Sequence, residues 1–127
     1  MNFKEIKQMN EYLKENQVYE TTLEYRGSEH GWSYDDFHKK AGNKGWTVTL
    51  FKILHGDCIG GFTTQSWDIK SHGNRDKREV RDDKAFLFNL SCARIFPSTN
   101  SGKDIFCSSN FGPAFGGGGV MELSADE

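Results

Sequence analysis

The sequence contains little proline, little cysteine and no long apolar run, and each shortage excludes a class of protein. Two of the 127 residues are Pro and three are Cys, with no CxxC pair. An odd number of such cysteines argues against a disulfide framework, so a reducing, cytoplasmic location is expected. No apolar run approaches the roughly 20 residues that cross a bilayer, and the first residues lack the apolar core of a signal peptide. We therefore expect no insertion into a membrane.

An excess of charge of one sign is also absent. The formal net charge is −2, which offers no general attraction to DNA or RNA, so nucleic acid is not an expected partner. Aromatic residues and glycine are plentiful instead, with ten Phe, four Tyr, three Trp and 14 Gly. A length of 127 residues suits one small domain, which buries roughly two-thirds of the surface of its unfolded chain. Residues 1–127 are therefore interpreted as one domain with many tight turns. Its core is expected to be aromatic and built from seven residues at strand and helix-cap positions: Trp32, Phe37, Trp46, Phe62, Phe86, Phe88 and Phe115.

The first predicted element is an amphipathic helix over Asn2–Asn16, because apolar residues recur at helical spacing: Phe3, Ile6, Met9 and Leu13. We expect this helix to cover the core, although a partner-binding role is an open alternative. A second, short helix is predicted from Tyr34 to about Lys40. Ser33 and Asp36 have the spacing of a capping box. Trp32 and Phe37 are placed to form a hydrophobic staple around that cap.

Period-two patterns predict the strands. A first strand is expected over Val18–Tyr25, followed by a polar turn, and an antiparallel hairpin over Trp46–Leu54 and Cys58–Thr64. The Gly60-Gly61 pair inside the hairpin indicates a bulge or a close backbone approach. Later strands are predicted in four apolar stretches: Ala85–Leu90, Arg94–Phe96, Asp104–Ser108 and Val120–Leu123. Seven or so short strands with turns between them are typical of a β-sandwich.

Residues Asp68–Lys84 interrupt these strands with a run of mixed charge and almost no apolar residue. The run is predicted to be a long exposed loop, far longer than the usual connection of about four to six residues. Long loops of this kind are either functional or simply solvated, and the composition does not separate the two.

Four stretches, in this order, resemble the TLDc domain of the oxidation-resistance proteins, and their residues are closer to TLDc-like proteins of protists than to the animal members. They are YRGSEHGWSYDDFH from Tyr25, IGGFTTQSW from Ile59, AFLFNL from Ala85 and FGPAFGGGG from Phe111. The resemblance covers roughly Tyr12 to Leu123. It implies a mainly β fold with short α-helices, arranged as a two-sheet antiparallel β-sandwich. TLDc domains usually continue beyond the Gly-rich stretch, so this sandwich is expected to lack its last strands or to borrow them.

Catalytic and metal-binding interpretations find little support in the residue spacings. Gly116–Gly119 is followed by a strand-like stretch without the Lys of a phosphate loop, so we expect close backbone packing rather than nucleotide binding. Glu29, Asp35 and Asp36 beside a Trp allow sugar chemistry, but the two aspartates are better explained as first-turn charges of a helix. His and Cys pairs lack the spacing of metal ligands, so neither a metal nor another cofactor is expected.

The resemblance to TLDc implies a non-catalytic protein-interaction module, associated with protection against oxidative stress and, in several members, with binding of the vacuolar proton pump (V-ATPase). Two alternatives stay open: a structural subunit of a larger protein assembly, and a redox-active protein that uses one of Cys58, Cys92 and Cys107. We expect a protein partner to bind where the Arg26–His30 turn meets the charged loop. The candidate contact residues are Arg26, Glu29, His30, Arg75, Lys77 and Arg78.

Overall fold

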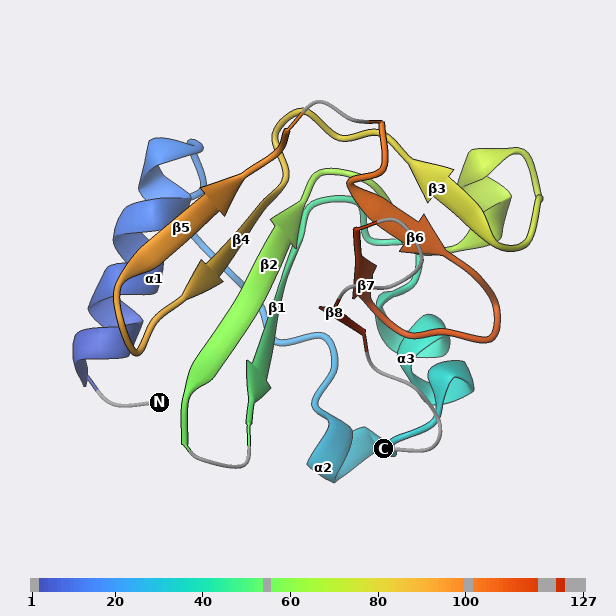
Figure 1. Cartoon of the computed structure of the whole chain (residues 1–127). Helices are drawn as coiled ribbons and strands as arrows, with labels where there is room; N and C mark the ends of the chain where they lie inside the picture. Colours follow the sequence, from blue (N-terminus) through green and yellow to red (C-terminus); the bar gives the residue numbers. More distant parts are fainter. Residues whose placement is uncertain (1–2, 54–55, 100–101, 117–120, 123–127) are drawn as a thin grey trace.

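A computed structural model of the chain describes residues 3–53, 56–99, 102–116 and 121–122 (Figure 1). The helices are α1 (Phe3–Glu15), α2 (Gly27–His30), α3 (Tyr34–Ala41) and the 3-10 helix η1 (Ile69–His72). The strands are β1 (Thr47–Lys52), β2 (Cys58–Thr63), β3 (Arg78–Val80), β4 (Phe86–Asn89), β5 (Arg94–Pro97), β6 (Ile105–Cys107), β7 (Ala114–Phe115) and β8 (Met121–Glu122).

The strands form two antiparallel sheets, which confirms the predicted fold class. The first sheet has the order β1-β2-β4-β5 and the second has the order β3-β6-β7-β8. The predicted hairpin is present, with Thr47 opposite Thr63 at one end and Lys52 opposite Cys58 at the other. The turn between β4 and β5 is also where the sequence predicts it.

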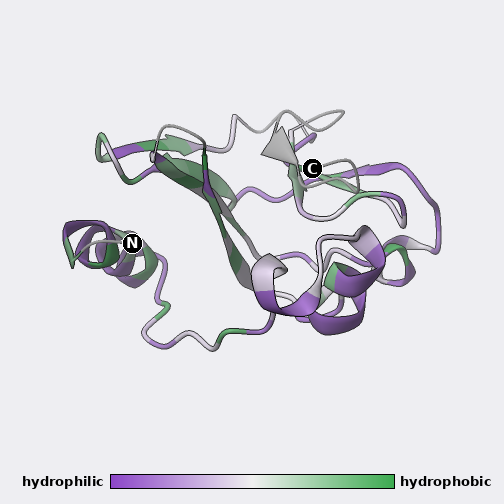
Figure 2. Cartoon of the chain, turned by 90° about the horizontal axis from the view of Figure 1, so that it is seen from below, coloured by the Kyte–Doolittle hydropathy of each residue, from purple (hydrophilic) through white to green (hydrophobic). Residues whose placement is uncertain are grey.

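The first sheet is the middle layer of the molecule. Helix α1 packs on one face through Met9, Tyr12 and Leu13, which share a buried cluster with aromatic residues of β2 and β4. On the other side, residues of the second sheet and of α3 form a second buried cluster. Figure 2 shows α1 and α3 on opposite sides of the first sheet. The prediction that the N-terminal helix covers the core is therefore confirmed.

Close packing explains the two adjacent glycines of β2. A Cβ atom on Gly60 would lie 2.2 Å from the carbonyl oxygen of Thr49 and 2.7 Å from the ring of Phe88. A Cβ atom on Gly61 would lie 2.4 Å from the ring of Phe115, which belongs to the second sheet. The β1–β2 register runs through both glycines without a bulge. Of the two predicted alternatives, the close approach is therefore confirmed.

The helix cap at Ser33 is confirmed, and the staple is not. The backbone amide of Asp36 donates to Ser33 Oγ at 3.1 Å, and Ser33 Oγ donates to a carboxylate oxygen of Asp36 at 2.8 Å. Trp32, however, is 56% exposed and its ring lies against Gly27, where a Cβ atom would approach it to 2.5 Å. The segment expected to be a turn before Trp32 is helix α2, a single helical turn.

The strand predicted over Val18–Tyr25 is wrong. These residues have no regular secondary structure, and Tyr19 and Leu23 are 74% and 60% exposed. A strand requires an adjacent strand with which its backbone N–H and C=O groups can form hydrogen bonds. A period-two pattern in one segment does not show that such an adjacent strand exists. Tyr25 is nevertheless anchored, because its hydroxyl donates to the carbonyl oxygen of Gly31 and its ring packs edge-on against Phe37.

The predicted aromatic core is confirmed for five of its seven members, which are at most 6% exposed: Phe37, Phe62, Phe86, Phe88 and Phe115. It is wrong for Trp32 and for Trp46, which is 50% exposed. Trp67 is the large aromatic that the core contains instead, at 1% exposure. Its indole nitrogen donates to Thr47 Oγ1 at 3.0 Å, which satisfies the polar end of a buried ring.

Asp68–Lys84 is not one long exposed loop, so that prediction is wrong in part. The segment contains η1 and β3, and Val80 and Asp82 within it are buried. Strand β3 exists because it pairs with β6, with Arg78 opposite Cys107 and Val80 opposite Ile105. The residues around this strand are exposed, as expected.

Two predictions concern residues that the structure describes only in part. Most of the Gly116–Gly119 stretch lies outside the described residues. Half of the expected strand Val120–Leu123 does so too, and β8 is its described portion. The expectation of missing or borrowed closing strands stays a prediction.

Candidate functional site

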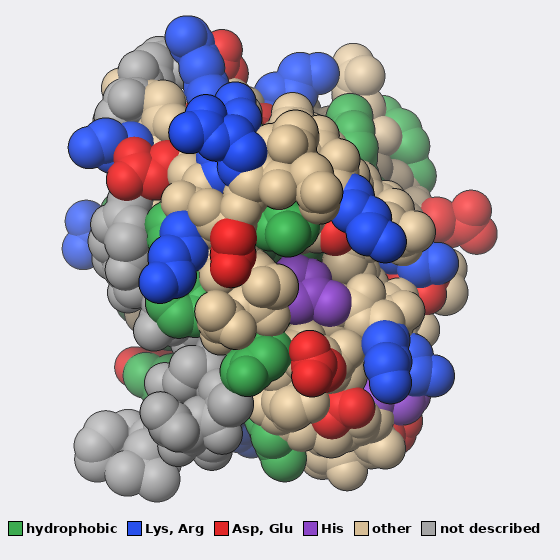
Figure 3. Space-filling model, turned by 90° about the vertical axis from the view of Figure 1, so that its right-hand side faces the viewer, with side chains coloured by type: hydrophobic (Ala, Val, Ile, Leu, Met, Phe, Trp, Pro, Cys, Tyr) green, Lys and Arg blue, Asp and Glu red, His purple; other side chains and the backbone are tan. Residues whose placement is uncertain are grey.

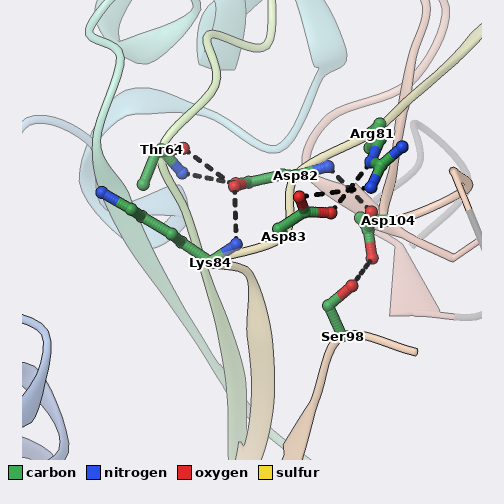
Figure 4. A network of polar contacts seen from close by, with 7 residues as sticks. All are labelled: Thr64, Arg81, Asp82, Asp83, Lys84, Ser98 and Asp104. Atoms are coloured by element: carbon green, nitrogen blue, oxygen red, sulfur yellow. Dashed lines mark hydrogen bonds and ion pairs between the residues drawn. The ribbon is translucent and has the colours of Figure 1, made fainter. Parts of the chain in front are cut away.

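Asp82 joins the two sheets through a buried carboxylate. It lies after β3, at the point where the chain crosses from the second sheet to the first, and is 4% exposed (Figure 4). The carboxylate accepts hydrogen bonds from Thr63 Oγ1 at 2.6 Å, Thr64 N at 2.7 Å and Thr64 Oγ1 at 2.9 Å. The backbone amide of Lys84 donates a fourth, at 3.1 Å. These four donors occupy the lone pairs of the carboxylate. Asp82 is therefore a structural anchor with no free lone pair for catalysis.

A second carboxylate extends this network. Asp104, which precedes β6, accepts a hydrogen bond from the backbone amide of Asp82 at 2.8 Å and another from the hydroxyl of Ser98. Ser98 follows β5, so the network connects the ends of strands from both sheets. The crossover between the sheets is thereby held in one conformation.

An open hollow lies beside this crossover. It has a volume of about 480 Å³ and is lined by Trp46, Thr64, Gln65 and the run Arg81–Lys84. The ammonium group of Lys84 lies 5.5 Å from the ring centroid of Trp46, which is a cation–π contact. Trp46 in turn packs edge-on against buried Phe62, so a half-exposed aromatic face is held rigidly at the rim.

The acidic side chains between residues 75 and 84 are all engaged within the protein. Asp76 bonds to Ser109, Glu79 lies 3.8 Å from the Lys103 ammonium, and Asp83 accepts from Arg81 Nε at 2.9 Å. Asp82 is buried, as described above. Among the residues that the structure describes, no ion pair involves the remaining cations of the segment: Arg75, Lys77, Arg78 and Lys84. Asp76 is the one exposed carboxylate of the run without an ion pair in the described structure, so cations outnumber carboxylates among the unpaired charges at this surface.

Asp76 fixes the exposed turn before β3. Its carboxylate accepts from the backbone amide of Ser109 at 2.9 Å, from Ser109 Oγ at 3.2 Å and from the amide of Lys77 at 3.0 Å. Arg78 adds a contact from Nη1 to the carbonyl oxygen of His72 at 3.2 Å. The turn is thus tied both to η1 and to the connection after β6. It is an ordered surface rather than a loosely attached loop.

The Asp76 carboxyl group is expected to titrate below its ordinary pKa of 3.8. Hydrogen bonds from the Ser108 hydroxyl and the Ser109 backbone amide lower its pKa because they favour the charged form. The resulting stabilisation is present above pH 3.8 and is lost as the pH falls through the lower pKa of the folded state. Carbon-13 NMR titration of Asp76 checks this, and Ser108→Ala should raise the measured pKa. A value at or above 3.8 in the wild type would contradict the proposed anchoring.

The other predicted contact group lies elsewhere on the molecule. Arg26, Glu29 and His30 belong to α2 or directly precede it, and Figure 1 places α2 below α3, well away from η1 and β3. Arg26 Nη1 pairs with Glu29 Oε1 at 3.1 Å, and His30 Nδ1 accepts from the Arg26 amide at 2.9 Å. The six predicted residues therefore form two separate groups, not one continuous surface, and their role in partner binding stays a prediction.

The cysteines differ in their access and their acidity. Cys58 and Cys107 are buried and Cys92 is exposed. Burial raises the pKa of Cys58, with a further contribution from Glu5, and burial raises the pKa of Cys107 to about 12. Because the thiolate is the nucleophilic form, these two environments suppress thiol chemistry at neutral pH. Cys92 is the thiol that a redox role would have to use.

Sequence reasoning identified the charged segment but missed what organises it. Asp82 was counted with the exposed acidic residues, and Trp46 was assigned to the core. A signal for Asp82 was the polar pair Thr63-Thr64 at the end of a strand, whose hydroxyl groups need acceptors once the strand is buried. The pairing of Trp46 with Lys84 carried no such signal, because the two residues are 38 positions apart and no local pattern relates them.

The described residues contain neither a candidate metal centre nor a candidate membrane span. No group of three or more His, Cys, Asp or Glu residues within the described ranges could hold a metal ion. Likewise, no described helix has the length and apolarity needed to cross a bilayer.

Comparison with known proteins supports the resemblance seen in the motifs. No curated protein matches the chain. A protein-family model, that of the TLDc domain, does match it, and the match extends over residues 1–127. The two antiparallel sheets with flanking helices agree with that assignment. This chain therefore belongs to the TLDc domain family.

Proposed function

We propose that this TLDc domain is a non-catalytic protein-interaction module. The observation that carries the proposal is the ordered cationic surface around β3, where the acidic side chains are engaged internally and Arg75, Lys77 and Arg78 face solvent. Figure 3 shows Lys and Arg side chains mostly in the upper half of the face that η1 and β3 occupy, with Asp and Glu side chains among them. Family membership favours a role in protection against oxidative stress, with the vacuolar proton pump as a candidate partner.

Order in this segment favours binding over simple solvation. A surface that is already fixed loses little conformational entropy when a partner docks, whereas a loose loop loses about 1–2 kcal/mol per ordered residue. Asp76 and Arg78 supply that order through their contacts to Ser109 and His72. The neighbouring cations Arg75 and Lys77 can then meet an acidic surface without first being arranged.

The α2 group is a secondary contact in this proposal. Arg26 and Glu29 largely cancel each other's charge, since they form an exposed ion pair at 3.1 Å. A partner broad enough to reach from β3 to α2 would meet both surfaces.

Reversal of Arg75, Lys77 and Arg78 to Glu is expected to slow partner association and to change its salt dependence without unfolding the domain. The physical reason is that these side chains are exposed and steer an acidic surface by long-range attraction. Pull-downs from the native lysate, with partners identified and quantified for the wild type and the triple variant, measure the effect.

A matched control reverses three exposed lysines of α1: Lys4, Lys7 and Lys14. It changes the net charge by the same amount on a different surface, and thermal melting verifies that both variants fold. Loss of partners in the β3 variant alone supports the proposal. Identical partners and amounts in the wild type and the β3 variant would refute it, and loss in the α1 variant alone would transfer the interaction to the N-terminal helix.

A further inference from the structure

The hollow beside the crossover combines a free cation with a rigid aromatic face. Lys84 has no ion-pair partner within the described part of the chain, and its ammonium group rests 5.5 Å from the Trp46 ring centroid. The Trp46 ring is 50% exposed. A ligand that reaches this point meets a positive charge and an apolar surface side by side.

The two acidic residues lining the hollow are engaged by other groups of the protein. The Asp82 carboxylate is 4% exposed and accepts four hydrogen bonds from Thr63, Thr64 and the Lys84 amide, which occupy its oxygens and leave its negative charge in place. The Asp83 carboxylate is held by the Arg81 guanidinium through two contacts at 2.9 and 3.3 Å. Of the two cations that line the hollow, Arg81 is paired with Asp83, and Lys84 has no ion pair within the described residues.

We infer that this hollow binds an acidic side chain with an apolar neighbour, presented by an extended segment of a protein partner. The carboxylate would pair with Lys84 and the apolar side chain would cover the exposed face of Trp46. This inference rests on the proposed function and names the chemistry of the partner.

The shape of the hollow favours a peptide over a small molecule. Sites for small ligands enclose most of the ligand surface, whereas this hollow of about 480 Å³ is open to solvent. A single side chain anchored by a longer segment does not need such enclosure. Nucleic acid is disfavoured because the chain carries a net charge of −2 and the hollow offers one cation without an ion pair in the described residues.

The test follows the indole N–H of Trp46 by NMR during titration with acetyl-Leu-Asp-Glu-Leu-amide. Saturable shifts are expected at millimolar peptide, and acetyl-Leu-Lys-Lys-Leu-amide should produce none. Lys84→Gln should weaken binding about tenfold. Trp46→Leu, followed at the Lys84 amide, should weaken binding as well. Lys52→Gln is the matched control, because Lys52 is an exposed lysine of β1 that does not line the hollow.

The outcomes separate the partner classes. Absence of a saturable shift with the acidic peptide, or equal affinity in the wild type and Lys84→Gln, overturns the inference. If glutarate binds as tightly as the acidic peptide, the ligand of the hollow is a small dicarboxylate. If oligouridylate binds and its binding depends on Lys84, the ligand is nucleic acid. Either result overturns the inference of a peptide ligand. The β3 charge reversal leaves Trp46 and Lys84 in place, so failure of the pull-down and failure of the titration are distinct results.

Discussion

Phe88→Ala is expected to cost about 3–5 kcal/mol of unfolding free energy, and Phe86→Ala a similar amount. Phe88 is 2% exposed at the centre of the first sheet, where it contacts Tyr12 of α1 and lies directly against Gly60. Phe86 stacks on Phe62 at a centroid distance of 5.1 Å. Removal of either ring leaves a cavity between α1 and the sheet that rigid strands cannot fill.

Urea unfolding of the purified domain measures this loss. Phe96→Ala is the matched control, because Phe96 lies on the neighbouring strand β5 and is 45% exposed. Its truncation should change stability by about 0.5 kcal/mol. Similar unfolding midpoints for Phe88→Ala and the wild type would show that the α1 face of the sheet is not the core of this domain.

Asp82→Ala is expected to cost roughly 3 kcal/mol, the second largest effect. The substitution removes the acceptor of four hydrogen bonds, and each buried donor left without a partner costs about 1–3 kcal/mol. Thr63 is fully buried, so water cannot replace the lost carboxylate at its hydroxyl. The loss should be larger than that of an ordinary surface aspartate because the crossover between the two sheets depends on it.

Asp83→Ala supplies the comparison at the adjacent position. Its ion pair with Arg81 is solvent-exposed, and exposed pairs contribute about 0–1 kcal/mol. Hydrogen exchange of the Thr64 and Lys84 amides should accelerate in Asp82→Ala and stay near the wild-type rate in Asp83→Ala. Equal stability and equal exchange in the two variants would remove Asp82 from its proposed structural role.

The candidate site was predictable in its location and not in its chemistry. The charged run marked residues 68–84 as unusual, and the cationic contacts Arg75, Lys77 and Arg78 lie within it. No pattern within this run of residues indicates which of its charged side chains face solvent. That distinction depends on partners distant in the chain, such as Ser109 for Asp76 and Thr63 for Asp82. The sequence analysis also expected the Arg26–His30 turn and the charged segment to form one surface. The structure separates them, and no local pattern indicates how far α2 lies from β3.

Local interactions let the sequence alone determine α1, the Ser33 cap and the β1–β2 hairpin. Each of these depends on residues within a few positions or on a periodicity that any environment preserves. Tertiary structure decided the rest. Charged Arg78–Val80 became a strand because β6 accepted its hydrogen bonds, while the strand-like Val18–Tyr25 stayed irregular because it has no such pairing. Backbone pairing is a property of two segments, so a pattern in one of them cannot decide it.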